Sequence, residues 1–314
     1  MFFIGSCFIG SLMQYEFFEV NRGATLDAPS IGVPVGARPF RTQLLKWVGN
    51  KQRFAHEIAS FFPATTGKYF EPFLGSAAVL GTLAPKRALG SDSFGPLIEI
   101  WKTLKHEPDK LIEWYGVRLR LCSKIGKERA YEEIKANYNA IPNPADFIFL
   151  SRSCYGGVVR FRRDGYMSTP CGPHTPVSVE SFTQRVRIWR QRVREAEFER
   201  LDYREAMKQA REGDIVYCDP PYSFTQAILY GAQSFNLAEL LETIAACKMR
   251  GAAVILSIDG SKKSGQFICD IPIPTGLFKR EVAVNVGRSM LRRFQRGGDT
   301  LENEVVHDRL LLTY

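Results

Sequence analysis

Residues 213–222 read Gly-Asp-Ile-Val-Tyr-Cys-Asp-Pro-Pro-Tyr, an apolar run that leads directly into an acidic residue, two prolines and an aromatic. The apolar, β-branched part predicts a central strand that is covered on both faces of its sheet. Because proline fixes φ and has no amide hydrogen, the end of this strand is rigid and holds its flanking side chains in place. A carboxylate and a neighbouring carbonyl there can accept both hydrogens of an exocyclic amino group, while an aromatic ring stacks on the heterocycle. We therefore predict a site for a planar amine, with Asp219, Pro220 and Tyr222 as its catalytic residues.

The chain around this stretch alternates short apolar runs with helical patterns from about residue 41 onward. Further strands are expected at residues 69–72, 87–90 and 253–257. Such alternation is typical of parallel strands joined by crossover helices, so we predict an α/β fold with a doubly wound, mostly parallel sheet. Residues 279–286 and 305–314 alternate apolar and polar side chains, which predicts an antiparallel pair at the end of the sheet.

Composition narrows the class of protein. The chain has 314 residues, of which 45% are hydrophobic and 24% charged, and these values exclude collagen-like, disordered and coiled-coil proteins. A net charge of +9 and an isoelectric point near 9.2 favour a polyanionic partner, nucleic acid first. Seven scattered cysteines, with no C-x-x-C pair and no Cys/His cluster, indicate reduced cytoplasmic thiols and no metal site. The apolar residues 1–13 lack a basic flank and are too short to cross a bilayer, so we expect an N-terminal arm or linker over residues 1–40 and no membrane contact.

Residues 95–182 do not follow the alternation of strands and helices seen in the rest of the chain. A helical stretch over residues 111–138 precedes Arg160-Phe-Arg-Arg-Asp-Gly-Tyr-Met167. The Asp164-Gly165 pair between extended residues predicts a tight β-hairpin with a type I′ turn, which requires positive φ. Apolar residues at 182, 186, 189, 193 and 196 then predict a helix buried along one stripe, and the arginines beside that stripe are expected to face solvent. These are Arg185, Arg190, Arg192 and Arg194.

Two shorter features indicate a cofactor. Residues 69–78 place an apolar strand before a glycine turn and a helix start, an arrangement that lets a ligand approach the backbone. Asp92, at the end of the following strand, can accept hydrogen bonds from ribose hydroxyls, so the pattern indicates a nucleoside-bearing cofactor. Trp47 and Lys51 could cover an adenosyl group and neutralise a carboxylate, although taken alone they fit a helix start with a packed Trp better.

Four blocks in this order resemble the Dam-type DNA adenine methyltransferases, over about residues 41–314. Residues 46–51 (Lys-Trp-Val-Gly-Asn-Lys) resemble the opening motif of that family, and residues 71–77 (Glu-Pro-Phe-Leu-Gly-Ser-Ala) resemble its glycine turn. Residues 150–172 resemble its block that contacts DNA, and residues 219–222 its Asp-Pro-Pro-Tyr motif.

The chain departs from the family pattern at three positions. Gly156 replaces the usual Asn, and Val158 stands where some members place a larger apolar residue, so the recognised site need not be the familiar GATC. Ala77 replaces a second glycine, which is tolerable where the backbone does not adopt positive φ.

The resemblance implies S-adenosylmethionine as methyl donor and, as acceptor, the N6 amino group of an adenine flipped out of double-stranded DNA. It also implies a Rossmann-like methyltransferase sheet with an inserted, mainly helical recognition domain that carries the hairpin. Beyond the arm, we expect a cofactor half at 41–94, a target-recognition domain at 95–182 and a methyl-transfer half at 183–314. The expected cofactor contacts are Trp47, Lys51, Glu71, Phe73, Gly75, Asp92 and Asp219. The expected DNA contacts are Lys46, Arg152, Tyr155, Arg160, Arg162, Arg163 and Pro170.

Alternative functions keep the same donor and change the acceptor to cytosine N4 in DNA, adenine in structured RNA, or a glutamine amide. Asp219, where glutamine-modifying enzymes typically carry Asn, and the long insertion with its hairpin disfavour the protein and RNA targets, and cytosine stays open. Another alternative is an inactive relative that only binds DNA. No obligate protein partner follows from the sequence, and a cognate restriction endonuclease is left open.

Overall fold

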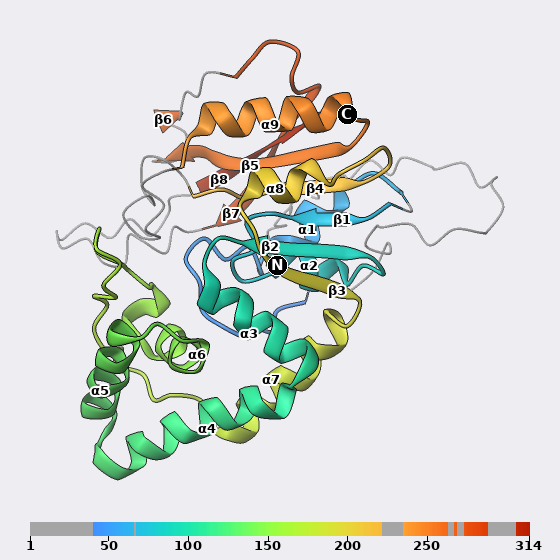
Figure 1. Ribbon diagram of the computed structural model, residues 1–314. Helices are drawn as coiled ribbons and strands as arrows, with labels where there is room; N and C mark the ends of the chain where they lie inside the picture. The colour runs from blue at the N-terminus through green and yellow to red at the C-terminus, as the bar shows by residue number, and fades with distance from the viewer. Residues whose placement is uncertain (1–39, 66, 222–234, 263–266, 269–272, 288–305) are drawn as a thin grey trace, which may run out of the picture.

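One sheet organises the fold. The computed structural model describes residues 40–65, 67–221, 235–262, 267–268, 273–287 and 306–314, and the statements below concern these residues (Figure 1). Seven strands follow the order β3-β2-β1-β4-β5-β8-β7, and a short strand, β6, pairs with β5. The strands are β1 (Tyr69–Glu71), β2 (Ala88–Asp92), β3 (Ala196–Arg200), β4 (Ile215–Cys218), β5 (Ala253–Lys262), β6 (Phe267–Ile268), β7 (Arg280–Gly287) and β8 (Val306–Leu312).

The pairing confirms the predicted doubly wound, mostly parallel sheet. β1 lies between β2 and β4 and is parallel to both, and the outer pairs β2–β3 and β4–β5 are also parallel. β8 pairs antiparallel with β5 and with β7, which confirms the antiparallel terminal pair. The prediction was wrong at Ala196, which opens β3 rather than extending a helix. The preceding helix has its C-cap at Val193, and Ala196 is buried opposite Ala88 of β2.

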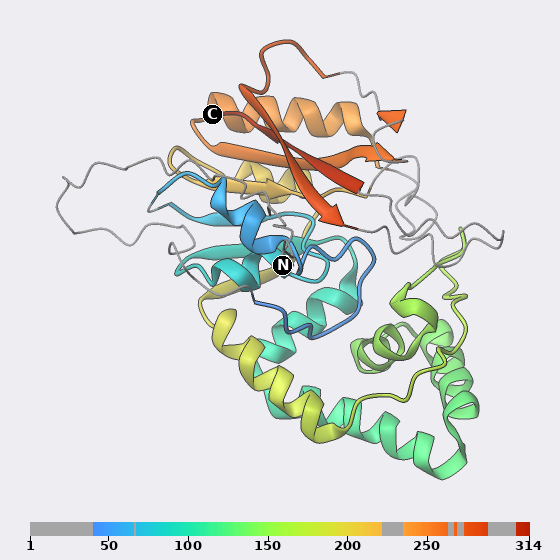
Figure 2. The ribbon, with the colours of Figure 1, turned by 180° about the vertical axis from the view of Figure 1, so that it is seen from behind.

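Alternating side chains bury the sheet on both faces. Ile215 and Tyr217 of β4 belong to the core on one face, and Val216 and Cys218 belong to the core on the other. Helices α1 and α9 lie on opposite faces, as the front and back views show (Figures 1 and 2). The first face is packed by α1 (Ala55–Ser60), α2 (Ala78–Leu83), α3 (Gly95–His106) and α7 (Val179–Arg192), and the second by α8 (Tyr203–Lys208) and α9 (Leu237–Met249).

A helical part stands away from the sheet (Figure 1). It contains α4 (Pro108–Ile125), α5 (Lys127–Ala140) and α6 (Pro144–Ser153). Asn143 caps α6 by accepting a hydrogen bond from the Asp146 amide, and Pro144 occupies the first turn, where no amide hydrogen is required. Among the described residues, no helix combines the length and the apolar character that a membrane crossing needs. The division into a cofactor half, a recognition domain and a methyl-transfer half stays a prediction.

The hairpin of the insertion forms with a different turn. Phe161 and Met167 make an isolated antiparallel bridge, and the Gly165 amide donates to the Arg162 carbonyl at 3.0 Å. Gly165 has φ of +84°, but Asp164 is not among the described residues with positive φ. A type I′ turn needs positive φ at both residues, so that prediction was wrong. The loop instead places only the glycine in the left-handed region, as in three-residue hairpin loops.

Two of the four arginines beside α7 also depart from the prediction. Arg190 and Arg194 are exposed, but Arg185 donates to the Gln43 carbonyl and Arg192 donates to the Thr82 carbonyl while its guanidinium stacks on Phe40. The irregular segment 40–44 supplies carbonyls that no ladder satisfies, and buried carbonyls need donors. This segment therefore draws Arg185 inward, whereas Arg192 is held by the Thr82 carbonyl of α2 and by the Phe40 ring.

Replacing two helical glycines by alanine is predicted to have opposite effects on the free energy of unfolding. A Cβ on Gly81 of α2 would lie 2.3 Å from the buried Trp189 ring, whereas a Cβ on Gly116 of α4 would first meet the flexible end of Arg120, at 3.4 Å. We expect Gly81→Ala to lower the free energy of unfolding by about 1–3 kcal/mol through overpacking. Gly116→Ala should raise it by about 0.5–1 kcal/mol through helix propensity. Thermal melting of both variants beside the unaltered chain checks this, and shifts of the same sign would contradict it.

Candidate functional site

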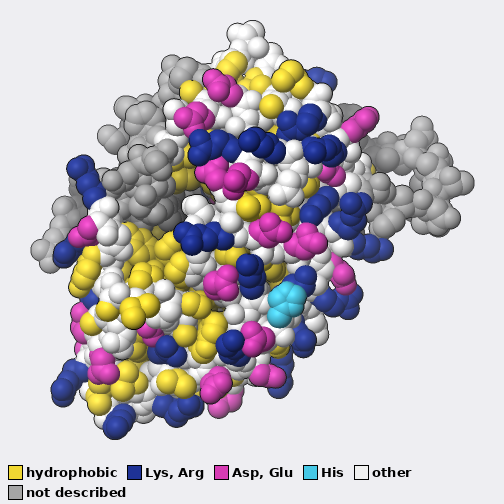
Figure 3. Space-filling view, in the orientation of Figure 1, with side chains coloured by type: hydrophobic (Ala, Val, Ile, Leu, Met, Phe, Trp, Pro, Cys, Tyr) yellow, Lys and Arg dark blue, Asp and Glu magenta, His cyan; other side chains and the backbone are white. Residues whose placement is uncertain are grey.

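A cavity of about 270 Å³ opens where β1, β2 and β4 end at their carboxyl termini. In open sheets, ligands bind at this edge where the strand order reverses, here between β1 and β4. The volume is far beyond that of one water and close to the lower limit of small-molecule sites. On the face drawn in Figure 3, hydrophobic side chains gather over the helical part, while Lys and Arg are spread among acidic side chains over the rest.

The cavity brings together all seven residues predicted to bind the cofactor. Pro220, predicted as catalytic, also lines it, whereas Tyr222 lies outside the described residues. Sequence analysis missed other lining side chains. One of these is Tyr203, which comes shortly after the carboxyl end of β3. Because β3 was not predicted, the sequence analysis did not look for site residues there. The seven predicted residues are Trp47, Lys51, Glu71, Phe73, Gly75, Asp92 and Asp219.

Aromatic rings form two walls of the cavity. Phe73 stacks on Tyr203 with ring centroids 5.2 Å apart. Phe94 links Trp47, at 6.0 Å, to Phe161 of the hairpin, at 5.5 Å. Because Phe161 also lines the cavity, the base of the hairpin reaches the same site as the strand ends.

Gly75 fits its position closely. Its φ is +46°, and a Cβ there would lie 2.9 Å from Cδ1 of Trp47, so both the backbone and the space favour glycine. Its amide donates to Oδ2 of Asp92 at 3.1 Å. Ala77, two residues on, has φ of +51°, so the expectation that it avoids positive φ was wrong. A non-glycine residue in this region costs about 1–2 kcal/mol, and Ala77 holds it as the N-cap of α2.

Two carboxylates of the cavity, one buried and one half-buried, accept specific donors. Oε2 of Glu71 accepts from the Tyr69 hydroxyl and from the Leu80 amide, each at 2.8 Å. Burial raises the pKa of Glu71 to about 8, with Asp219 adding to the rise and these two hydrogen bonds opposing it. Burial also raises the pKa of Asp92, against the amides of Phe94 and Gly75.

Lys51 lies between two carboxylates at the Asp-Pro-Pro corner, Asp219 and Asp308. The Lys51 ammonium lies 3.2 Å from Oδ1 of Asp219 and 2.6 Å from Oδ2 of Asp308. Burial lowers the pKa of Lys51, but the two carboxylates outweigh it and the net shift is upward. Sequence analysis missed Asp308. Its signal was an acid on β8 in the alternating register of the buried Leu310 and Leu312.

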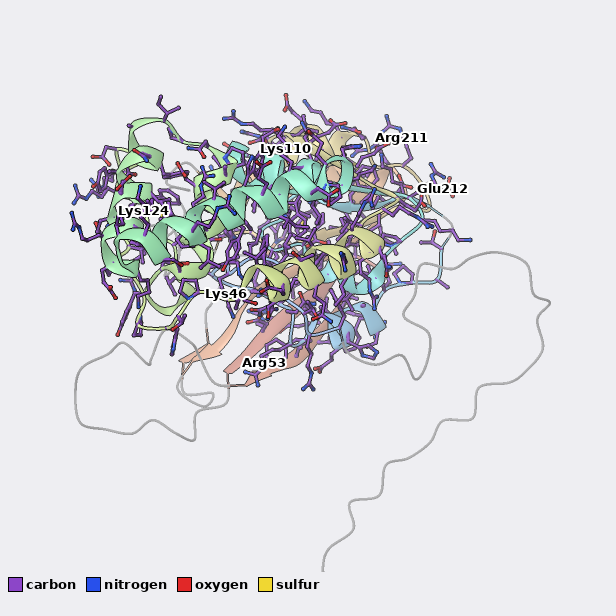
Figure 4. All side chains as sticks on the ribbon, turned by 90° about the horizontal axis from the view of Figure 1, so that it is seen from below. Lys46, Arg53, Lys110, Lys124, Arg211 and Glu212 are labelled. Carbon is purple, nitrogen blue, oxygen red and sulfur yellow. The ribbon has the colours of Figure 1, made fainter. Side chains whose placement is uncertain are left out.

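The predicted DNA contacts divide into exposed and buried side chains. Arg152 donates to the carbonyls of Gln43 and Leu44, at 3.2 and 2.7 Å, so its guanidinium is engaged inside the protein. Lys46 lies between the helical part and the sheet (Figure 4) and donates to Oε1 of Gln43. Partial desolvation and the charges of Arg152 and Arg185 lower the pKa of Lys46. The remaining predicted contacts are all exposed, namely Tyr155, Arg160, Arg162, Arg163 and Pro170.

The raised pKa of Glu71 predicts a pH-dependent stability. Between its ordinary value near 4.5 and about 8, the folded chain holds a proton at Glu71 that the unfolded chain has lost, so this residue lowers stability progressively as pH rises. Glu71→Gln keeps an acceptor for Tyr69 and Leu80 and removes the titration. In urea unfolding from about pH 5 to 8, the free energy of unfolding of the variant should rise relative to that of the unaltered chain as pH rises. Glu281→Gln is the control. Because Arg309 lowers the pKa of Glu281, the effect of this substitution on the free energy of unfolding should not change with pH above about pH 6. A difference in free energy of unfolding between Glu71→Gln and the unaltered chain that does not change with pH would contradict the raised pKa of Glu71.

Comparison with known proteins places these features in one family. The model of the D12 class N6 adenine-specific DNA methyltransferases matches residues 47–270. The DNA N-6-adenine-methyltransferase of Escherichia phage P1 is 26% identical over 72% of this chain and 31% of its own length. The Retron Ec67 DNA adenine methylase of Escherichia coli is 30% identical over 58% of this chain and 64% of its own length. A Type II methyltransferase of Lactococcus lactis subsp. cremoris is 24% identical over 76% of this chain and 87% of its own.

The chain spans less than two thirds of the length of the first two of these relatives. The family match, in contrast, runs from Trp47 at the cavity wall through β1, β2 and the Asp-Pro-Pro corner to residues beyond β5, and so covers most of the chain. On this match, the chain belongs to the D12 class of N6 adenine-specific DNA methyltransferases.

Proposed function

We propose that this chain transfers a methyl group from S-adenosylmethionine to the N6 amino group of an adenine in double-stranded DNA, at a specific site. The observation that carries the proposal is the meeting of Asp219 and Pro220 with Trp47 and Asp92 around one cavity. The family and the names of its relatives support the adenine-specific reaction and DNA as the partner. Similarity to a Type II methyltransferase keeps a cognate restriction endonuclease as an open expectation.

The lining of the cavity fits S-adenosylmethionine by charge and shape. Asp92 and Asp219 line it, and these acids suit a ligand that carries a sulfonium and an ammonium, while Glu71, mainly protonated near neutrality, offers hydrogen-bonding groups. Trp47 and Phe73 offer ring surfaces to the adenosyl group, and Asp92 offers carboxylate oxygens to the ribose hydroxyls. When bound, the donor supplies an activated methyl group on sulfur.

The Asp-Pro-Pro corner is the part of this chain that receives the target base. An amino group stacked inside a duplex is out of reach, so the adenine must be flipped out at a cost of a few kcal/mol. Asp219 would accept a hydrogen of the amino group, and the rigid end of β4 would hold that carboxylate in a fixed place. The contribution of the protein is then alignment of the amino nitrogen and stabilisation of the charge that develops on it.

DNA contacts are assigned to the exposed loops of the insertion. Arg160, Arg162 and Arg163 flank the hairpin, and the guanidinium of Arg162 lies 4.6 Å from the Tyr166 ring centroid. Arginines on an exposed hairpin can contact phosphates and base edges, which fix position and sequence respectively. The net charge of +9 favours the approach to a polyanion and predicts binding that weakens as salt rises.

Asp219→Ala should lower turnover at least ~100-fold, as removal of one preorganised polar group from an active site does. The fold should be retained, because Lys51 keeps Asp308 as partner, and much of the DNA affinity should remain, because the exposed arginines of the hairpin are unchanged. Transfer of a radiolabelled methyl group to duplex DNA, followed by nucleoside analysis, measures the effect and identifies the base. Glu242→Ala on the exposed side of α9 is the control. Unchanged turnover would refute the role of Asp219, and 4-methylcytosine as the sole product would overturn the adenine acceptor.

Arg160→Ala should weaken or relax recognition of the site by about 1–3 kcal/mol, the range for loss of a base-reading arginine. The measurement is DNA affinity together with the pattern of methylated sites in cells that express the variant. Arg194→Ala removes the same charge from an exposed position between α7 and β3 and should leave both unchanged. A normal affinity with an unaltered pattern for Arg160→Ala would show that this arginine does not read DNA.

A further inference from the structure

Lys51 is held by two carboxylates that play different parts. Asp219 lines the cavity beside Lys51, whereas Asp308 is not among the residues that line it. The side chains of Lys51 and Asp308 are each 8% exposed and that of Asp219 is 18% exposed, so Lys51 contacts one acid that lines the cavity and one buried acid that does not. Asp308 also falls outside residues 47–270, the part of the chain that matches the family. The contact that joins Asp308 to the lining of the cavity is the one with Lys51.

The position of Asp308 is costly for a charge. On the same face of β8, Leu310 and Leu312 are buried in the core shared with β4 and β5. A carboxylate there is tolerated because the Lys51 ammonium lies 2.6 Å away. An apolar side chain in this register would satisfy packing equally well, so packing alone does not account for an acid at this place.

The two distances indicate which contact is the firmer one. The Lys51 ammonium donates a hydrogen bond to Asp308 at 2.6 Å, within the short range of charge-assisted bonds, and lies at a longer 3.2 Å from Asp219. With Asp219 as its sole acid, the ammonium would be bound to the carboxylate that the target amino group requires. With Asp308 also bound, Lys51 keeps a partner when its contact with Asp219 is exchanged for another anion.

We propose that Asp308 is a positioning residue, which anchors Lys51 so that the ammonium binds the carboxylate of S-adenosylmethionine and leaves Asp219 for the target amino group. This inference rests on the proposed function, because it assigns the cofactor to the cavity. No covalent step involves Asp308. Its effect is on the place and the partners of one ammonium group.

The test is cofactor binding by calorimetry with two ligands. Asp308→Asn should weaken the binding of S-adenosylmethionine about tenfold, the loss expected for one charged hydrogen bond. Decarboxylated S-adenosylmethionine lacks the group that Lys51 would bind, so its dissociation constant should change less than about twofold. Glu281→Gln removes another acid from the β7–β8 pair, the partner of Arg309 at 2.6 Å, and should alter neither constant.

A double-mutant cycle shows whether Asp308 acts through Lys51. In chains that carry Lys51→Met, adding Asp308→Asn should leave the affinity for S-adenosylmethionine unchanged. Lys51→Met leaves the Asp308 carboxylate buried without its ammonium, whereas the double variant buries neither charge, so thermal melting of all three variants accompanies the binding measurements.

Three outcomes overturn the inference: unaltered affinity in Asp308→Asn, equal weakening for both ligands, or an effect of Asp308→Asn that persists beside Lys51→Met. Failure of the unaltered chain to bind S-adenosylmethionine would instead refute the proposed function.

Discussion

The hydrogen bonds that join β1 to both β2 and β4 fix where the charged groups of the cavity lie, because parallel pairing brings the carboxyl ends of the three strands to one edge. Glu71 ends β1, Asp92 ends β2 and Asp219 follows β4. The core on both faces of the sheet locks this register, since a slip of one residue would turn every buried side chain to the opposite face. The sheet order thus sets the places of these three carboxylates, and loops add Trp47 and Phe161 to the lining.

Each carboxylate at this edge has donors of a different kind. Glu71 has a hydroxyl and an amide, and its pKa of about 8 keeps it mainly protonated near neutrality. Asp92 has two backbone amides, from Gly75 and Phe94. Asp219 has the Lys51 ammonium, which is itself shared with a second acid. Their donors therefore distinguish these carboxylates, together with their different burial.

Local signals made much of the fold and the cavity predictable. The apolar run before Asp219, the glycine turn at Gly75 and the acid at Asp92 each lie within a few residues of the strand that positions them. Contacts between distant segments were not predictable in this way: Asp308 meets Lys51 across 257 positions, and Arg152 meets Leu44 across 108. The turn at Asp164 was mistaken because Arg162 pairs with Tyr166, which leaves three residues in the loop rather than two, and Ala77 was mistaken because its positive φ belongs to the N-cap of α2.

The segment just before Trp47 has a mechanical consequence for the molecule. The carbonyls of Thr42, Gln43 and Leu44 accept hydrogen bonds from Trp189, Arg185 and Arg152 respectively. Helices α6 and α7 therefore both bind the same few peptide groups. These peptides continue within three residues into the indole that walls the cavity. A shift of either helix would move these peptide groups and, with them, the Trp47 ring, so motions of the helical part are coupled to the wall of the cavity.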